Sequence, residues 1–178
     1  LGVADPERIV SSLVDDERRK RLNTERQLDL GYDFEGLGRF RVNIFHQRGV
    51  MSLVIRVIPN RIRAIPELNL PPVIEQLANE RRGLILVTGT TGSGKSTTLA
   101  AIIDHINRTR QAHIITIEDP IEYVHGDRLS FVNQREVGYD AVNFSSALRA
   151  ALRQNPDVIL VGEMRDLETI ETAIMAAE

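Results

Sequence analysis

The sequence contains no cysteine and no tryptophan, and only 4% of its 178 residues are aromatic. Without cysteine, disulfide bonds and thiolate metal sites within the chain are excluded. No apolar run approaches the roughly 18 residues of a membrane-spanning helix. The first residues also lack the basic, apolar and cleavage regions of a secretory signal. A strong charge of one sign is missing too, because the formal net charge is -3, so no overall field points to nucleic acid or to an anionic membrane.

What remains is typical of a globular protein. Hydrophobic residues make up 42% of the chain and charged residues 26%, a balance that permits a sizeable core. The length is sufficient for one ordinary domain or for two small ones. The sequence has no initiating methionine, and its last residues stop within a helical pattern. We therefore expect both ends to have been cut from a longer protein.

The first third of the chain changes from a helical to an alternating apolar pattern. A helical opening and a charged surface helix over 15–23 come first. Alternation then predicts three strands, at 28–32, 40–44 and 53–58. Turn residues separate these strands, so the pattern predicts an antiparallel meander with one buried face. Four prolines follow and predict a linker over 59–72.

From residue 73 onward, continuous apolar strands alternate with helices. The strands are expected at 84–87, 114–117 and 158–161. The helices are expected at 73–79, from Lys95 onward and near 145–154. Apolar strands separated by helices predict parallel pairing with both faces of the sheet covered. The predicted fold class is therefore α/β, with one domain over 1–58 and another over 73–178.

Residues 89–96 match the phosphate-binding pattern G-x-x-x-x-G-K-[ST] in full. A strand is expected before this P-loop and a helix after it, the setting in which backbone N–H groups surround phosphate oxygens. Lys95 would neutralise the β and γ phosphates of ATP, and Ser96 would offer its hydroxyl to Mg²⁺. The predicted nucleotide contacts are Gly89, Thr90, Thr91, Gly92, Ser93, Gly94, Lys95, Ser96 and Thr97.

Acidic residues follow two predicted strands at the end where parallel sheets bind ligands. Glu122 comes after the strand at 114–117. Glu163 follows the strand at 158–161 in a Gly-Glu pair, where Asp-Glu is more usual. Hydrolysis needs a metal anchor and a group that orients or deprotonates water. Glu122 and Glu163 join Lys95 as catalytic candidates, and Ser96 and Glu163 are the candidate ligands of Mg²⁺. The alternative is that acids merely end strands at the solvent edge.

Other charged residues have weaker indications. Glu118 and Asp119 are expected to be surface or structural residues. On the strand around Arg39 and Arg41, the arginines share the face opposite the apolar residues, and a solvated sheet face is the default interpretation. The four histidines show no metal-ligand spacing, and a surface position is favoured for them.

Four separated motifs, in order, resemble the secretion ATPase superfamily of type II secretion and type IV pili. They lie at 92–100, 115–123, 147–157 and 162–169. Within that superfamily, the runs at 132–138 and 162–166 are most similar to the PilT-type retraction motors of twitching motility. The resemblance covers nearly the whole chain.

The resemblance implies a fold and an assembly. The meander would be the latter part of a PAS-like N-terminal domain, and the second domain would be part of a RecA-like core. The protein would be a homo-hexameric ATPase at the cytoplasmic face of the inner membrane. It would contact the membrane only through partners, namely the inner-membrane pilus platform protein and the pilus machinery.

The resemblance also implies residue roles. Glu122 would hold the position of the family's catalytic glutamate, and Glu163 would be the acid of an atypical Walker B motif. Arginines of the N-terminal domain would approach the nucleotide of a neighbouring subunit. The candidates for this role are Arg39, Arg41, Arg48 and Arg56.

Three rival functions are compared with pilus retraction. A pilus-extension or type II secretion motor is a close rival, and the run at 134–138 favours retraction. A nucleotide-binding regulatory paralogue is disfavoured because Lys95, Ser96, Glu122 and Glu163 are all intact. A DNA-translocating motor is disfavoured by the net charge of -3 and by the lack of a basic stripe interleaved with aromatic residues.

Overall fold

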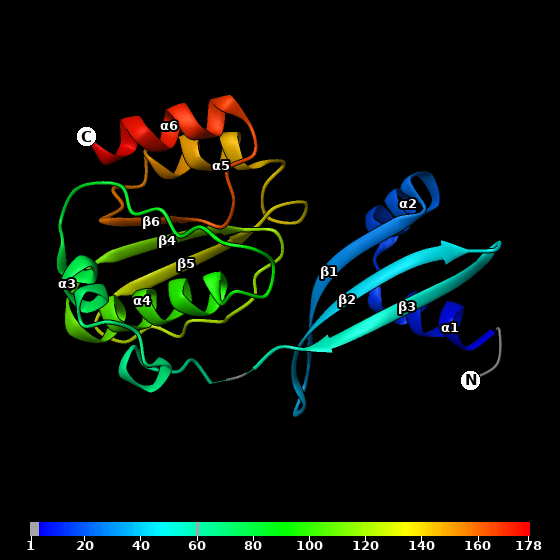
Figure 1. Ribbon diagram of the computed structural model, residues 1–178. Helices are drawn as coiled ribbons and strands as arrows, with labels where there is room; N and C mark the ends of the chain where they lie inside the picture. Colours follow the sequence, from blue (N-terminus) through cyan, green and yellow to red (C-terminus); the bar gives the residue numbers. More distant parts are fainter. Residues whose placement is uncertain (1–3, 60) are drawn as a thin grey trace. The chain divides into compact units, whose positions relative to one another are not determined.

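The computed structural model describes residues 4–59 and 61–178, and it divides into two compact units, Leu1–Asn60 and Arg61–Glu178 (Figure 1). The boundary between the units falls within the predicted linker at 59–72. Residues 1–3 of the predicted first domain and Asn60 of that linker lie outside the described residues. Among the described residues, no helix combines the length and the apolar character that crossing a bilayer requires.

The first unit is a three-stranded sheet with two helices. Its elements are α1 (Ala4–Leu13), α2 (Asp16–Glu25), β1 (Gln27–Phe34), β2 (Gly38–Gln47) and β3 (Val50–Val57). The strands pair antiparallel in the order β1-β2-β3, which confirms the predicted meander. Asp15 caps α2 by accepting a hydrogen bond from the Arg18 N–H at 2.8 Å. At the turn between β2 and β3, Arg48 and Gly49 both have positive φ, as a two-residue hairpin turn requires.

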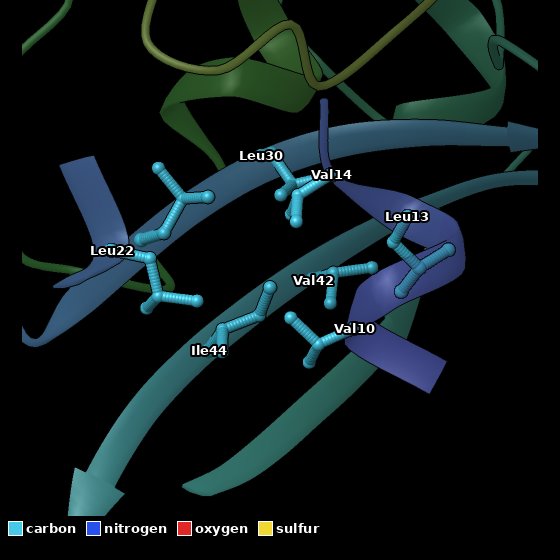
Figure 2. Packing of buried hydrophobic residues seen from close by; sticks show 8 residues of the cluster. Val10, Leu13, Val14, Leu22, Leu30, Val42 and Ile44 are labelled. Atoms are coloured by element: carbon cyan, nitrogen blue, oxygen red, sulfur yellow. The ribbon is translucent and has the colours of Figure 1, made fainter. Parts of the chain in front are cut away.

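The core of the first unit lies between the helices and one face of the sheet. Val42 and Ile44 have no exposed surface, and they face Leu30 and Leu28 across the β1–β2 ladder. Figure 2 shows Leu30, Val42 and Ile44 meeting residues of both helices. The helix residues in this cluster are Val10, Leu13, Val14 and Leu22. Because side chains alternate along a strand, Arg39 and Arg41 lie on the opposite face, as predicted.

The second unit is a parallel sheet with helices on both faces. Its elements are η1 (Pro66–Leu68), α3 (Val73–Asn79), α4 (Lys95–Thr109), β4 (His113–Glu118), β5 (Phe131–Glu136), α5 (Phe144–Ala151), β6 (Val158–Val161) and α6 (Leu167–Ala177). The strands pair parallel in the order β5-β4-β6. The α/β class and the parallel pairing are therefore confirmed.

The two faces of the second sheet pack against different helices. Ile115 and Ile117 of β4 are buried against α5 and α6, whereas Ile114 is buried against α3 and α4. Figure 1 shows the same layers, with α5 and α6 on one side of the sheet and α4 on the other. Both β5 and β6 pair with β4 in parallel, so the carboxyl ends of the three strands lie at one edge of the sheet. That edge is where ligands bind in such sheets.

The strands differ from the sequence prediction in two places. Residues 84–87, expected to form a strand before the P-loop, pair with no described strand, and Leu84, Ile85 and Leu86 are 45%, 42% and 60% exposed. A strand needs a neighbour in register, and an apolar run does not specify that neighbour. Conversely, β5 was not predicted, because polar and charged residues such as Gln134 and Glu136 dominate it.

Candidate nucleotide site

The P-loop leads directly into α4, as predicted. Gly94 is the N-cap of this helix, with a φ of 96°, and it provides no side-chain hydrogen bond to the first N–H groups of α4. Gly89 has a φ of 152°, and a Cβ atom there would lie 2.6 Å from the Ser93 hydroxyl oxygen. The loop therefore folds back on itself in a way that requires glycine. A helix N-terminus of this kind favours phosphate.

Lys95 spans the loop with its side chain. Its ammonium donates hydrogen bonds to the carbonyl oxygens of Gly89 and Thr90, both at 2.9 Å. The positive charge is thus held against the backbone of the same loop whose N–H groups would surround a phosphate. Residues 89–93 are exposed and 94–97 are half-buried, so a ligand can reach the loop. The residues present fit the triphosphate of a nucleotide.

Thr97, a predicted nucleotide contact, has a protein partner. Its hydroxyl lies 3.0 Å from the hydroxyl of Tyr123. Tyr123 belongs to the segment 119–125 that follows β4, which we call the acid loop because it carries Glu122. The first turn of α4 and the acid loop are therefore joined by a hydrogen bond. Ser96 precedes Thr97 and is half-buried.

The ends of β4 and β6 come together at the sheet edge. The Gly162 N–H donates to the Ile117 carbonyl oxygen at 2.8 Å. A Cβ atom on Gly162 would lie only 3.2 Å from that oxygen and 3.3 Å from the Glu118 Cα atom. This crowding explains why glycine stands where an aspartate is more usual. Glu163 follows and forms an ion pair with Arg165, with 2.8 Å between Oε2 and Nη2.

Glu118 is more enclosed than the sequence indicated. Its Oε1 accepts hydrogen bonds from the Thr116 hydroxyl at 2.7 Å and from the Gln134 amide at 3.3 Å, and its Oε2 accepts one from the Glu122 N–H at 3.5 Å. Burial raises the pKa of the Glu118 carboxyl above its usual range, although these hydrogen bonds oppose the shift. Asp119 is exposed. Glu118 is thus a structural member of the site, one of the two roles expected for it.

The donor set for Mg²⁺ is small. The described part of the chain holds no cluster of three or more histidine, aspartate or glutamate residues that could bind a metal ion. Mg²⁺ beside a nucleotide is ordinarily held by one or two protein groups together with phosphate oxygens and water. A hydroxyl from Ser96 and a carboxylate from Glu163 are the oxygen donors that suit this ion.

The four candidate arginines occupy the first unit. Arg39 pairs with Asp33 and Arg41 pairs with Asp29, each at 2.6 Å. Arg56 lies beside Arg41 in the β2–β3 register, so Arg39, Arg41 and Arg56 share the solvent face of the sheet. Arg48 lies in the turn that follows β2 and is exposed. Their action on a neighbouring subunit remains a prediction.

The surface position favoured for the histidines was wrong for His125. This side chain is only 9% exposed, and its Nδ1 has no hydrogen-bond partner. Desolvation lowers the pKa of His125 to about 4, although the charge of Asp104 acts in the opposite direction. His125 is buried because the acid loop packs onto β5. The His125 N–H donates a hydrogen bond to the Gln134 side chain at 2.7 Å.

Sequence reasoning also missed the roles of Gln134, Glu136 and Gly162. The detectable signal was polar residues at alternate positions of a short segment, which places them on one face of a strand. Buried polar groups of that kind need partners. The partners of Gln134 and Glu136 in the acid loop depend on the β4–β5 register, and the sequence does not reveal that register.

Comparison with known proteins gives a consistent result. The family model described as type II/IV secretion system protein matches residues 12–178. The type IV pilus retraction ATPase PilT of Pseudomonas aeruginosa is 49% identical over 170 residues, which cover 96% of this chain and 49% of that protein. A twitching motility protein of Neisseria gonorrhoeae is 48% identical and is covered over 46% of its length. The predicted resemblance to retraction motors is confirmed.

A solved structure agrees with these matches. The crystal structure of the pilus retraction motor PilT with bound ADP superposes with a TM-score of 0.93 and 53% sequence identity. The superposition covers 97% of this chain and 50% of that one. The chain spans about half the length of the relatives it matches.

Proposed function

Because the chain belongs to the type II/IV secretion system protein family, we propose that it is part of a hexameric motor that hydrolyses ATP to retract type IV pili. In this proposal the first unit is part of a PAS-like domain and the second is part of a RecA-like core. The motor works at the cytoplasmic face of the inner membrane, and its partners are the pilus platform protein and the pilus machinery. Similarity to a retraction ATPase over 96% of the chain supports the direction of movement.

The observation that carries the proposal is the pairing of the P-loop with the acid loop. Lys95 holds positive charge against the backbone of residues 89–90, and the Thr97–Tyr123 hydrogen bond brings the segment that carries Glu122 to the start of the same helix. Phosphoryl transfer to water depends on charge stabilisation and on an oriented nucleophile. These two loops supply groups for both needs.

Each residue then has a defined task. The P-loop backbone and Lys95 bind the β and γ phosphates. Ser96 and Glu163 hold Mg²⁺, which supplies charge neutralisation at the phosphates when it is bound. Glu122 orients the attacking water and accepts its proton. One or more of the arginines at 39, 41, 48 and 56 stabilise charge on the γ-phosphate of a neighbouring subunit.

A steady-state ATPase assay of the full-length protein tests these assignments. Lys95→Ala should abolish nucleotide binding or turnover, because the phosphate charge is no longer compensated. Glu122→Gln and Glu163→Gln should retain ADP binding and slow hydrolysis. Glu171→Gln, an exposed position on α6, is the matched control and should keep the wild-type rate. If either Glu122→Gln or Glu163→Gln keeps that rate, that residue has no part in the mechanism.

Deletion of the gene in its source separates the proposed function from its rivals. Loss of a retraction motor leaves pili present but unable to retract. Absence of pili would instead identify an extension motor, and unaffected pili with blocked export would identify a secretion motor. A regulatory paralogue would show nucleotide binding without turnover in the ATPase assay. Any of these three outcomes contradicts the proposal.

A further inference from the structure

The run at 134–136 carries part of the family resemblance, and the site described above gives it no chemical task. Gln134 and Glu136 lie on β5, where they face Thr116 and Glu118 of β4 in the parallel register. Positions two apart on a strand share one face. Both side chains therefore project from the sheet on the side where the acid loop passes, and Glu136 is only 5% exposed.

The Gln134 side chain binds the backbone of the acid loop at two points. Its amide nitrogen donates to the Tyr123 carbonyl oxygen at 2.8 Å, and its amide oxygen accepts from the His125 N–H at 2.7 Å. The single side-chain amide of Gln134 thus provides one donor and one acceptor to the loop backbone, as the backbone of a neighbouring strand would. Both bonds have good length, and both are partly shielded from water, where hydrogen bonds are stronger.

Glu136 binds the loop on the other side of Glu122. Its Oε2 accepts a hydrogen bond from the Ile121 N–H at 3.2 Å. The residue before Glu122 is therefore held by Glu136 and the residue after it by Gln134. The Glu122 side chain is half-buried, and the backbone on both sides of it is fixed to β5.

We propose that Gln134 and Glu136 are positioning residues that hold Glu122 in its hydrolytic place through the backbone of Ile121 and Tyr123. We call the pair the β5 clamp. This inference rests on the proposed role of Glu122 in hydrolysis. Neither clamp residue belongs to the predicted nucleotide contacts at 89–97. A misplacement of a reacting group by about 1 Å can cost on the order of 100-fold in rate. We therefore expect loss of the clamp to lower kcat and to leave nucleotide binding unchanged.

The first test replaces Gln134 by methionine in the full-length protein. Gln134→Met keeps the side-chain length and removes both hydrogen bonds to the loop, together with the bond from the Gln134 amide to Glu118. The expected result is a loss in kcat of roughly 10- to 100-fold, with the KM for ATP and the Kd for ADP within about twofold of wild type. Asn133→Leu is the matched control. Asn133 lies on the same strand and makes one side-chain hydrogen bond, to His113 at 2.8 Å, so its loss should leave kcat within about twofold of wild type.

Substitutions of Glu136 provide a second test, which can be read even if Gln134→Met does not fold. Glu136→Ala removes the acceptor for the Ile121 N–H and should lower kcat. Glu136→Gln keeps an oxygen at that position and should restore most of the rate. Equal loss in both Glu136 variants, or wild-type kcat in Gln134→Met, overturns the inference. So does a loss confined to nucleotide affinity.

A double substitution shows whether the clamp acts through Glu122. In the Glu122→Gln background, Gln134→Met should change the remaining rate by less than about twofold, because the group that it positions is already disabled. A full additional loss would mean that Gln134 acts elsewhere. The two proposals fail differently. Wild-type turnover in Glu122→Gln contradicts the role proposed for Glu122, on which the clamp rests. Slow turnover in Glu122→Gln with normal turnover in Gln134→Met contradicts only the clamp.

Discussion

Burial of His125 makes the stability of the second unit depend on pH below neutrality. In the folded protein the pKa of His125 is lowered from the ordinary value of 6.5 to about 4. Above pH 6.5 the imidazole is neutral in both states, and the full stability is present. As the pH falls from 6.5 towards 4, the unfolded chain binds a proton that the folded protein excludes. The free energy of unfolding must therefore decrease over this window.

The size of this decrease follows from the pKa difference. One pKa unit corresponds to about 1.4 kcal/mol, so the whole effect is about 3 kcal/mol, and at pH 5 it is about 2 kcal/mol. Asp104, which is 8% exposed and paired with Arg108 at 2.7 Å, moderates the shift because its charge favours the imidazolium. No hydrogen bond compensates the His125 Nδ1 atom, so desolvation prevails.

Urea unfolding between pH 8 and pH 5 measures the effect. His125→Phe keeps a planar ring and cannot titrate, so its stability should fall less on acidification than that of wild type. The difference between the two proteins should grow by about 2 kcal/mol from pH 8 to pH 5. Parallel curves over this range would refute the reasoning. A difference of opposite sign would show that the folded state favours the imidazolium.

Three further predictions concern other parts of the molecule. Ile44→Ala should lower the free energy of unfolding by about 2–5 kcal/mol, whereas Val54→Ala on the exposed face should have little effect, and parallel urea titrations compare them. Gly162→Asp should reduce stability and turnover more than Gly162→Ala, because even a Cβ meets the end of β4 at 3.2 Å; equal melting temperatures and rates would contradict this. Mixing Arg41→Ala subunits with Lys95→Ala subunits should recover ATPase activity if the arginine acts across subunits, and no recovery at any ratio counts against that role.

The sequence predicted the elements that depend on local signals. Residues 89–96 predicted a loop followed by a helix because glycine, lysine and serine at fixed spacing meet the backbone demands of that turn. The meander was predictable because its apolar residues alternate with one buried face. In both segments, the residue types that form the sequence pattern are the ones that the folded structure needs at those positions.

The remaining features depend on pairing between distant segments. The apolar run at 84–87 gave no information on a partner strand, and β5 was missed because its buried residues are polar. The roles of Gln134 and Glu136 depend on the register of β4 and β5, which brings these two side chains to the acid loop. The burial of His125 follows from the same contact, and no local pattern reports it.

The hydroxyl pair of Thr97 and Tyr123 has a mechanical consequence. Thr97 adjoins Ser96 at the start of α4, and Tyr123 adjoins Glu122, so a 3.0 Å hydrogen bond links the loop that would hold phosphate to the one that carries the acid. Moving either loop alone breaks this bond at a cost of about 1 kcal/mol. A shift of the first turn of α4 therefore either moves Tyr123 with it or breaks this bond, so a change at the phosphate-binding loop reaches the segment that carries Glu122.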